Sequence, residues 1–283
     1  MKLKDIIPEG LKPRIIKYLQ QIFLKSLESA RREQGWQQLS EELSSIVPDI
    51  SGQYSTFKVD SLYMKTKVRN MHAFQISLVK EIIDEFNNPV IVDIGDSSGT
   101  HLQYIIGLYG RNKNIKCISV NTDNCAIEKI RQRGLEAIKA RAEDLAQYNI
   151  DADFLLCFEL LEHLMDPCRF LYQLATKTKA KYLIVTVPYL KRSRVALEHI
   201  RFPYAAVETC AERTHIFEFN PQDWKLIVMH SGWDILKEQI YLQYPKKSFL
   251  RITKPLWRRL DVEGFYGLIL KRDDTWSSRY TDW

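Results

Sequence analysis

The sequence predicts an α/β fold in which a helical cap precedes a doubly wound, mostly parallel sheet of seven strands. Two observations favour this class. From residue 90 onward, short β-branched and apolar runs alternate with segments of helical periodicity, as they do where helices connect parallel strands. The first run, Val90 to Val92, ends in a loop with Gly95 and Gly99 before a helical segment begins, a pattern typical of ligand-binding turns in such sheets.

Residues 1–70 are expected to form the helical cap. Apolar residues recur at helical spacing between residues 11 and 47, and the pattern is interrupted near Gly35, so two helices fit. Pro48 ends the second of them. A third amphipathic segment, residues 72–86, presents apolar residues on one face and stops at a proline-containing turn before the first strand.

Residues 71–283 are expected to form the core domain. Its predicted strands lie at residues 90–92, 116–120, 135–139, 154–158, 182–187, 233–241 and 264–270. Helices are predicted at residues 124–133, closed by Gly134, and at residues 168–176. The last two strands have no long helix between them and are expected to pair antiparallel at one edge, while the earlier strands run parallel with right-handed crossovers. Ligands of such sheets bind beyond the carboxyl ends of the strands.

Composition favours a globular protein of the cytoplasm. Lys and Arg outnumber Asp and Glu by 41 to 35, and this net charge of +6 is too small to indicate nucleic-acid binding by itself. The five cysteines are odd in number and show no Cys-x-x-Cys spacing, which favours buried free thiols in a reducing compartment. The N-terminus lacks the apolar block of a signal peptide, and no stretch is long and apolar enough to predict a membrane span.

The loop after the first predicted strand is a candidate binding site. Glycine has no Cβ, so backbone N–H groups in such a loop can come close to a ligand. Asp93, at the carboxyl end of the strand, can bind a hydroxyl or an ammonium group there. Taken alone, the same pattern also fits an ordinary tight turn between a strand and a helix.

A second segment is more specific. Residues 153–167 read Asp-Phe-Leu-Leu-Cys-Phe-Glu-Leu-Leu-Glu-His-Leu-Met-Asp-Pro, which is a predicted strand followed by Glu-x-x-Glu-His-Leu-x-Asp-Pro. Together with the glycine loop and the order of elements, this segment resembles the class I S-adenosylmethionine-dependent methyltransferases over roughly residues 72–272. The resemblance implies a Rossmann-like seven-stranded sheet, S-adenosylmethionine as cofactor, and methyl transfer as the reaction.

Carried over by position, the resemblance places Asp93, Gly95 and Gly99 on the loop that approaches the methionine part and the ribose of the cofactor. Ser97 stands where the family has its middle glycine, which is tolerable if φ there stays below zero. At the end of the second strand the family has an acidic residue that binds both ribose hydroxyls. This chain has Asn121 there, an amide that still donates and accepts but carries no charge.

The adenine end departs further from the family. The usual Asp after the third strand aligns with Arg141, so Glu143 or Asp144 would have to substitute. Phe158, at the end of the fourth strand, is also counted with the cofactor-binding residues. These departures keep open an alternative of a different class, a non-catalytic binding or scaffold protein that retained the fold.

His163 is the leading candidate for a general base, with Glu162 beside it. Methyl transfer from a sulfonium mainly requires that the acceptor be held in line, and a hydroxyl acceptor must also lose its proton. The alternative is that both residues cap or brace the turn after the strand.

The same segment suggests a metal site. Glu159, Glu162 and His163 stand at i, i+3 and i+4 and can converge on one side of a helical turn, and His215 lies in a later segment that could return over the same pocket. Two carboxylates and two imidazoles would suit Mg²⁺, Mn²⁺ or Fe²⁺. The arrangement is similar to the metal site of small-RNA 3′-end 2′-O-methyltransferases and to the Glu-x-x-Glu-His of ubiquinone-pathway O-methyltransferases. A metal there would lower the pKa of the acceptor hydroxyl.

A basic insert is expected at residues 245–260. It combines basic and apolar residues, namely Lys246, Lys247, Arg251, Lys254, Arg258 and Arg259 with Phe249, Ile252, Leu256 and Trp257. Such a segment can lie on an anionic membrane or grip phosphates, which would suit a nucleotide sugar or a polyprenyl-linked glycan as acceptor. Alternatively, it is a solvated helix whose apolar side packs on the edge strands. The chain from Trp257 to Asp273 is similar to the ending of methyltransferases linked to bacterial surface-sugar synthesis.

These features predict a cytoplasmic methyltransferase that transfers methyl to a hydroxyl of a small-molecule or glycan-type acceptor. The enzymatic alternative is a metal-dependent RNA 2′-O-methyltransferase, which should show a continuous basic face with stacking aromatic residues. Lys and Arg are dispersed here except in the insert, so nucleic acid is not the expected partner. The oligomeric state is not specified by the sequence.

Overall fold

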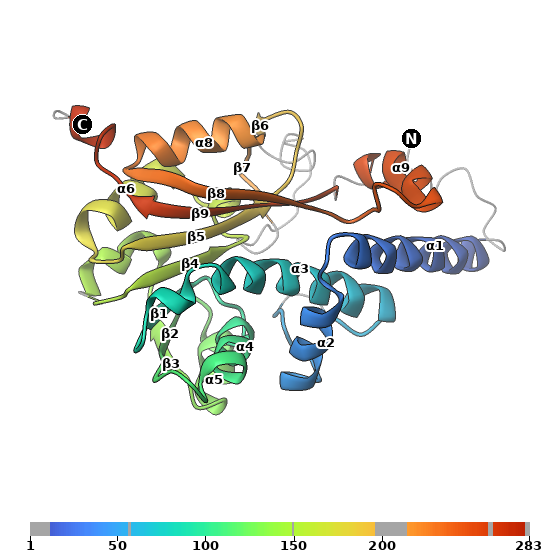
Figure 1. The fold of residues 1–283 in the computed structure, drawn as a ribbon, viewed down its shortest axis with the longest axis horizontal. Helices are drawn as coiled ribbons and strands as arrows, with labels where there is room; N and C mark the ends of the chain where they lie inside the picture. Colours follow the sequence, from blue (N-terminus) through green and yellow to red (C-terminus); the bar gives the residue numbers. More distant parts are fainter. Residues whose placement is uncertain (1–11, 56–57, 149, 196–213, 260–262, 281–283) are drawn as a thin grey trace.

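The computed structural model describes residues 12–55, 58–148, 150–195, 214–259 and 263–280. The predicted sheet has seven strands, in the order β3-β2-β1-β4-β5-β9-β8 (Figure 1). Their bounds are β1 Val90–Ile94, β2 Lys116–Asn121, β3 Glu136–Lys139, β4 Phe154–Phe158, β5 Tyr182–Pro188, β8 Trp233–Leu242 and β9 Gly264–Arg272. Neighbours among β1 to β5 pair in parallel and β8 pairs antiparallel with β9, as the sequence predicts, and β9 is also antiparallel to β5.

The parallel strands are recognisable in the sequence because helices cover both faces of the sheet and bury every side chain of the central strands. All five residues of β4 are buried, for example. The flanking helices are α4 Thr100–Tyr109, α5 Asn124–Gln132, α6 Pro167–Lys177 and α8 Pro221–His230, of which α8 has no counterpart among the predicted elements. Shorter pieces are η3 Ile83–Glu85, η4 Ala142–Tyr148, η5 Leu161–His163, β6 Arg194–Val195, β7 Phe217–Glu218 and η8 Ser277–Arg279.

Strand β1 is the point at which the strand order reverses. It pairs with β2 on one side and with β4 on the other, so that Asp93 aligns with Ser119 in β2 and with Leu156 in β4. The connections that leave β1 and β4 therefore diverge to opposite sides, and a crevice opens at the carboxyl ends of these strands.

The first two cap helices agree with the prediction. Helix α1 spans Lys12–Glu33 and α2 spans Gln37–Ile46. Between them Gly35 has φ +81°, a left-handed conformation that glycine adopts without steric cost. The remainder of the predicted cap segment, residues 1–11, lies outside the described residues.

The helix expected at the start of the core domain differs from the prediction. Helix α3 spans Leu62–Lys80 instead of residues 72–86, so the expected domain boundary at residue 70 falls inside a continuous helix. The hydroxyl of Ser61 caps it by accepting a hydrogen bond from the backbone N of Met64, 3.2 Å away.

Buried polar residues explain why apolar periodicity does not predict the first half of α3. Arg69 is only 7% exposed, and its guanidinium donates hydrogen bonds to the carbonyl oxygens of Val47 and Pro48 just after α2. Asn70 is fully buried and donates to the carbonyl of Leu27 in α1 at 3.1 Å. These contacts tie α3 to the rest of the cap, and a search for apolar periodicity does not detect them.

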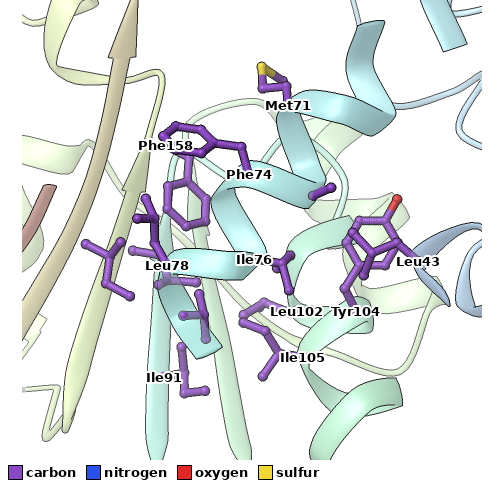
Figure 2. Close-up of a cluster of buried hydrophobic side chains, with 14 of the residues drawn as sticks. Leu43, Met71, Phe74, Ile76, Leu78, Ile91, Leu102, Tyr104, Ile105 and Phe158 are labelled. Atoms are coloured by element: carbon purple, nitrogen blue, oxygen red, sulfur yellow. The ribbon is translucent and has the colours of Figure 1, made fainter. Parts of the chain in front are cut away.

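The second half of α3 packs on the sheet (Figure 2). Phe74, Ile76 and Leu78 are fully buried in a core that also includes Ile91 of β1. In β9, Gly267 leaves room for this contact, because a Cβ there would lie 2.6 Å from Leu78 and 2.7 Å from Phe74. A second core fills the opposite face of the sheet, under α6 and α8.

The basic insert forms η7 (Phe249–Thr253) and α9 (Lys254–Arg259), which lie beside α1 and away from the sheet (Figure 1). Trp257 is fully buried in a small core with Phe23 and Leu27 of α1 and Leu242 at the end of β8. The apolar side of the insert therefore packs mainly on the cap, and only its border reaches an edge strand.

Four cysteines fall in the described residues, and all of them are free thiols, while Cys210 lies outside. A bilayer-spanning helix, long and apolar throughout, is absent from the described part of the chain.

Candidate active site

A cavity of about 630 Å³ lies at the carboxyl ends of β1, β2 and β4, with one wall from the core domain and the other from the cap. The core-domain wall includes Gly95, Ser97, His101, Asn121, Ala140, Ala142, Phe158, Glu159, Glu162, His163 and His215. The cap contributes Gln53, Tyr54, Ser55, Met64, Lys67, Met71 and Gln75. A cavity of this size is typical of small-molecule and cofactor sites.

The glycine loop forms one end of the cavity. Gly95 lines it with φ +87°, and a Cβ there would lie 3.2 Å from the Leu160 side chain. Ser97 also lines the cavity and does not have a positive φ, so the serine is compatible with its backbone. Gly99 has φ +76° but packs against Leu135, 2.8 Å from where a Cβ would be, and is not part of the lining. Its conformational role is therefore in the turn into α4.

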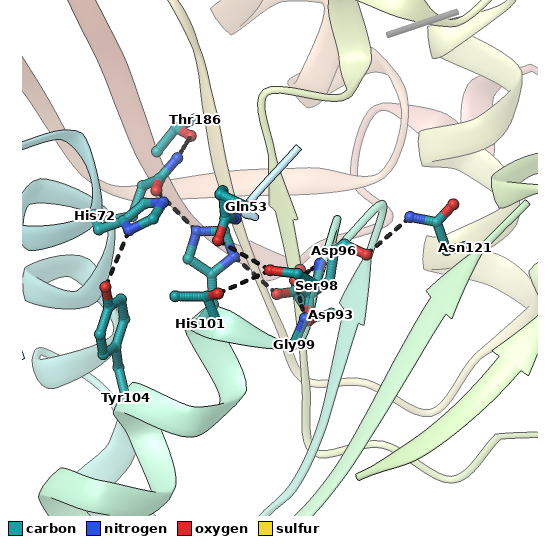
Figure 3. A network of polar contacts seen from close by, with 12 residues as sticks. Gln53, His72, Asp93, Asp96, Ser98, Gly99, His101, Tyr104, Asn121 and Thr186 are labelled. Carbon is teal, nitrogen blue, oxygen red and sulfur yellow. Dashed lines mark hydrogen bonds and ion pairs between the residues drawn. The ribbon is translucent and has the colours of Figure 1, made fainter. Parts of the chain in front are cut away.

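Asp93 faces a histidine inside the protein (Figure 3). Its carboxylate lies 3.0 Å from Nδ1 of His101, and the other ring nitrogen of His101 lies 3.1 Å from Oε1 of Gln75. Gln75 in turn donates to the hydroxyl of Thr186 at 3.1 Å. Since both ring nitrogens of His101 face oxygen acceptors, the imidazolium form is favoured.

The charges around His101 agree with that assignment. Burial lowers the pKa of His101, but the hydrogen bond and negative charge of Asp93 outweigh burial and raise the pKa above its usual value. Burial and the charge of Asp93 raise the pKa of the neighbouring Asp96 to about 7. Asp93, Asp96 and His101 are all buried, but only His101 is among the cavity lining.

The loop before α3 covers the glycine loop. Oε1 of Gln53 accepts a hydrogen bond from the Ser98 hydroxyl at 3.0 Å (Figure 3). The Ser55 hydroxyl donates to the carboxylate of Asp123, 2.7 Å away, at the start of α5. These two bonds hold the cap over the cavity on the side where β1 and β2 end.

Asn121, at the end of β2, lines the cavity but also braces the loops around it. Its amide nitrogen donates to the carbonyl of Asp96 at 2.8 Å, and its oxygen accepts from the backbone N of Asp123 at 2.8 Å. One amide hydrogen and one lone pair are thus committed to the protein.

The two acidic residues predicted for the adenine end are not in the cavity lining. Glu143 contacts Arg141 at 3.4 Å, and Asp144 accepts a hydrogen bond from Gln147 at 3.5 Å. The wall there is made by Ala140 and Ala142, so this end of the cavity is apolar.

The residue that follows strand β4 is strained. Glu159 has φ +51°, a left-handed conformation that is unusual for a side chain with a Cβ. The next turn is the 3₁₀ helix η5, which contains Glu162 and His163 but not Glu159. The three residues all line the cavity, although they do not share a continuous helical turn as the sequence suggested.

The two glutamates bring carboxylates into a buried position. Oε1 of Glu159 and both carboxylate oxygens of Glu162 are buried and have no hydrogen-bond partner from other residues in the described part of the chain. Burial raises the pKa of Glu159 to about 8, and burial together with the charge of Glu159 raises the pKa of Glu162 well above its usual value. At neutral pH the pair therefore holds at least one proton.

His163 is oriented by the segment that returns after β5. Its Nδ1 lies 3.0 Å from the carbonyl oxygen of Thr214, so in the neutral ring Nδ1 carries the proton and Nε2 is the basic nitrogen. The His215 ring packs edge-on against His163, 4.7 Å away, and Nδ1 of His215 lies 2.6 Å from Glu218. Ligand atoms of Glu162, His163 and His215 lie within 4.8 Å of one another, a group that does not include Glu159.

Sequence reasoning missed several polar residues of the cavity, including Gln53 and Ser55 before α3 as well as Lys67, Gln75 and His101. Lys67 and Gln75 lie on α3 and His101 on α4, and nothing in their local pattern distinguishes them from surface or core residues. Burial lowers the pKa of Lys67, an effect that the charge of Glu159 partly opposes. The position of His101, eight residues after Asp93 and in the first turn of α4, is the one signal that could have found the pair.

The fold is similar to the solved structures of two methyltransferases and of a cyclase. An O-methyltransferase of a polyketide synthase multienzyme from Brevibacillus brevis, solved with S-adenosylhomocysteine, is 12% identical with a TM-score of 0.52, and the alignment covers 76% of each chain. The 1,6-didemethyltoxoflavin-N1-methyltransferase of Burkholderia thailandensis, solved with its substrate and S-adenosylhomocysteine, is 10% identical with a TM-score of 0.51, over 72% of this chain and 79% of that one. The [4+2]-cyclase SpnF is 13% identical with a TM-score of 0.54, over 87% of this chain and 97% of that one.

These identities support the fold and not a particular reaction, since the three proteins act at different atoms. A search of the curated proteins found no significant match. A family model described as "Methyltransferase domain" matches residues 67–238, which is more than half of the chain and contains β1 to β5. The chain belongs to the methyltransferase domain family.

Proposed function

We propose that the protein is an S-adenosylmethionine-dependent methyltransferase that methylates a hydroxyl group of a small-molecule or glycan-type acceptor. The observation that carries the proposal is the orientation of His163. Its Nδ1 donates to the Thr214 carbonyl, so Nε2, which lies 3.8 Å from a carboxylate oxygen of Glu162, is the basic nitrogen at the wall of a cavity large enough for a cofactor and an acceptor.

Several features of the cavity suit S-adenosylmethionine. The wall at Ala140 and Ala142 suits an apolar base, and Gly95 permits close backbone approach. The cationic ring of His101 beside the glycine loop complements a carboxylate such as that of the methionine part. Bound S-adenosylmethionine would supply an activated methyl group on a sulfonium.

The protein's own residues would then act on the acceptor. When the acceptor hydroxyl is methylated, Nε2 of His163 would accept the proton that the hydroxyl loses. Glu159 and Glu162, which retain at least one proton between them, can accept or donate hydrogen bonds to acceptor hydroxyls.

A metal-assisted variant of this reaction is favoured by one observation. Ligand atoms of Glu162, His163 and His215 come within 4.8 Å of one another, and the Glu162 oxygens lack other hydrogen-bond partners in the described residues. One carboxylate and two imidazoles would suit Mn²⁺ or Mg²⁺, which would lower the pKa of a bound hydroxyl. In that case Nε2 of His163 is a ligand and not a base.

An acceptor panel tests the proposal. Transfer of labelled methyl from S-adenosylmethionine is measured with nucleotide sugars, lipid-linked glycans, amines and a short RNA, with EDTA and with added Mn²⁺. Methylation of a sugar hydroxyl supports the proposal, and loss of activity in EDTA with recovery on Mn²⁺ supports the metal variant. Methylation of RNA or of an amine alone would contradict the proposed acceptor class.

A further inference from the structure

The insert of η7 and α9 is held rigidly on the cap. The Glu33 carboxylate accepts hydrogen bonds from the backbone N of Lys246, Lys247 and Ser248, at 2.7, 3.0 and 2.8 Å. About two turns earlier in α1, the Ser26 hydroxyl lies 3.0 Å from the hydroxyl of Thr253. These contacts come from two turns of α1, so they fix both the position of the insert and its rotation.

Trp257 also attaches the insert to α1. It is fully buried, its Nε1 donates to the Ser26 hydroxyl at 3.1 Å, and its ring meets Phe23 edge-on with centroids 4.6 Å apart. The inward side of the insert is thus filled by Thr253 and Trp257.

Two large apolar side chains of the insert point to solvent. Phe249 is 84% exposed and Ile252 is 79% exposed, the two highest values among large apolar side chains in the described residues. They are three residues apart in a 3₁₀ helix, which has three residues per turn, and therefore lie on the same side. Because the contacts with α1 determine which side of the insert faces inward, the exposure of Phe249 and Ile252 is a fixed feature of the fold.

Basic residues surround the exposed pair. Lys246, Lys247 and Arg251 are exposed, and residues 246–258 contain no acidic side chain. Lys254 is a further cation of the insert, and partial burial together with the positive charges of Arg258 and Lys191 lowers its pKa.

Two carboxylates border this surface and offset only part of its charge. Glu33 accepts hydrogen bonds from three backbone N–H groups, and Glu263 accepts hydrogen bonds from Arg258 at 3.0 Å and from Tyr244. The five Lys and Arg residues between residues 246 and 258 outnumber these two carboxylates. Two protruding apolar side chains within a positive surface are the features that hold peripheral proteins at anionic membranes.

We propose that the tip formed by η7 and α9 docks on an anionic lipid bilayer, with Phe249 and Ile252 inserted at the level of the headgroups and with Lys246, Lys247 and Arg251 against lipid phosphates. The proposal does not depend on the methyl-transfer reaction. A bilayer accounts for the apolar pair, which has no role on the phosphate backbone of a nucleic acid. The tip lies at the end of the molecule beyond the sheet, where a flat surface can approach it (Figure 1).

Docking would also place the cavity near the membrane. Helix α1, which contacts the insert, also packs on α3. Helix α3 supplies Met64 and Lys67 to the cavity wall. One helix therefore separates the proposed lipid surface from the cap wall of the site.

Vesicle flotation with the full-length protein tests the proposal. The probes are vesicles of phosphatidylcholine alone and of phosphatidylcholine with phosphatidylglycerol, at physiological salt. The wild type is expected to float with the anionic vesicles and not with the neutral ones. Phe249→Ser/Ile252→Ser and Lys246→Glu/Lys247→Glu are each expected to weaken the partition coefficient about tenfold or more, since the apolar and electrostatic contributions are both needed.

Matched changes elsewhere serve as controls. Leu226→Ser removes a 52% exposed apolar side chain on α8, and Arg111→Glu/Lys177→Glu reverses two exposed charges after α4 and on α6. These variants are expected to float like the wild type, and circular dichroism with thermal unfolding verifies that all variants are folded.

The proposal would be overturned if the Phe249→Ser/Ile252→Ser variant floated as well as the wild type. It would also be overturned if the wild type floated with neither kind of vesicle, or if the control variants lost as much vesicle binding as the variants of the insert. Tight binding to a soluble RNA that is unchanged in Phe249→Ser/Ile252→Ser would assign the surface to a polyanion instead. A concentration-dependent dimer that this variant abolishes, without flotation of the wild type, would assign it to a second copy of the chain.

Discussion

The carboxylate of Asp93 lies 3.0 Å from Nδ1 of His101, and both side chains are buried. The acidic residue at the end of the first strand, which the sequence places at the cofactor, is therefore paired with a histidine that itself lines the cavity. The pair puts a positive ring at the glycine loop and joins it through Gln75 to the cap.

A double-mutant cycle measures this pair. Asp93→Asn and His101→Gln are each expected to lower the free energy of unfolding, with a coupling energy of roughly 1–3 kcal/mol, because either change leaves a buried partner unsatisfied. The exposed pair Lys179 and Asp151, 3.1 Å apart with side chains 78% and 72% exposed, is the control. Its coupling is expected to stay below about 1 kcal/mol. Equal coupling energies in urea unfolding would contradict the role assigned to Asp93 and His101.

Alanine substitutions at Gly99 and at Gly134 are expected to lower the free energy of unfolding by different amounts. Gly99 and Gly134 have nearly equal φ values, +76° and +75°, but a Cβ at Gly99 would lie 2.8 Å from Leu135 while a Cβ at Gly134 meets nothing within 4 Å. Alanine at Gly134 is expected to cost about 1–2 kcal/mol of unfolding free energy from backbone strain alone. Alanine at Gly99 is expected to cost more, since Leu135 must also move. The result to look for in thermal unfolding is the order of the two variants, and the reverse order would refute the packing argument.

The buried glutamates make stability depend on pH. Because the pKa of Glu159 rises from 4.5 to about 8 on folding, the folded protein retains a proton between these values that the unfolded chain releases. The free energy of unfolding therefore falls as pH rises through this window. Glu159→Gln is expected to flatten the decline and to stabilise the protein at pH 8 by roughly 1–3 kcal/mol.

Thermal unfolding at a series of pH values measures this effect. Glu143→Gln is the control, because the Glu143 side chain is 30% exposed and lies outside the cavity lining. A Glu159→Gln profile parallel to that of the wild type would show that Glu159 is not the titrating group.

His163→Asn tests the base. Asparagine keeps a donor near the position of Nδ1, so the bond to Thr214 can persist while the basic Nε2 is lost. With the acceptor found by the panel, kcat is expected to fall by about 10²–10⁴, the usual contribution of a general base. Affinity for the cofactor should change little. An unchanged kcat would exclude His163 from proton transfer.

His215→Asn separates the base from the metal variant. If His163 acts as a base without a metal, His215→Asn lowers kcat less than His163→Asn does, and EDTA has no effect. If a metal is bound, both variants lose activity to a similar extent, and Mn²⁺ binding measured by calorimetry on the wild type is lost in both.

Sequence reasoning located the sheet well for a physical reason. Parallel strands such as β4 are buried on both faces, so they stand out as short apolar runs between helices. The start of α3 was missed because Arg69 and Asn70 are buried polar residues that donate hydrogen bonds to backbone carbonyl groups, a property that apolar periodicity cannot report.

The site was predictable where function follows the backbone. The residues after β1 and β4 meet in the cavity because the carboxyl ends of adjacent parallel strands are neighbours. The residues at the adenine end were not predictable from the sequence. A one-residue difference in the η4 turn decides whether Ala142 or Glu143 lines the wall of the cavity. His101 and Lys67 enter from helices whose rotation depends on tertiary packing.

Isothermal titration calorimetry with S-adenosylmethionine and S-adenosylhomocysteine tests the central claim most directly. Wild-type protein is expected to bind both with micromolar dissociation constants. Ala142→Trp, which fills the apolar end of the cavity, is expected to abolish binding without unfolding the protein. If the folded wild type binds neither compound at millimolar concentration, the cavity is not a cofactor site, and the chain is a binding or scaffold protein that shares the fold.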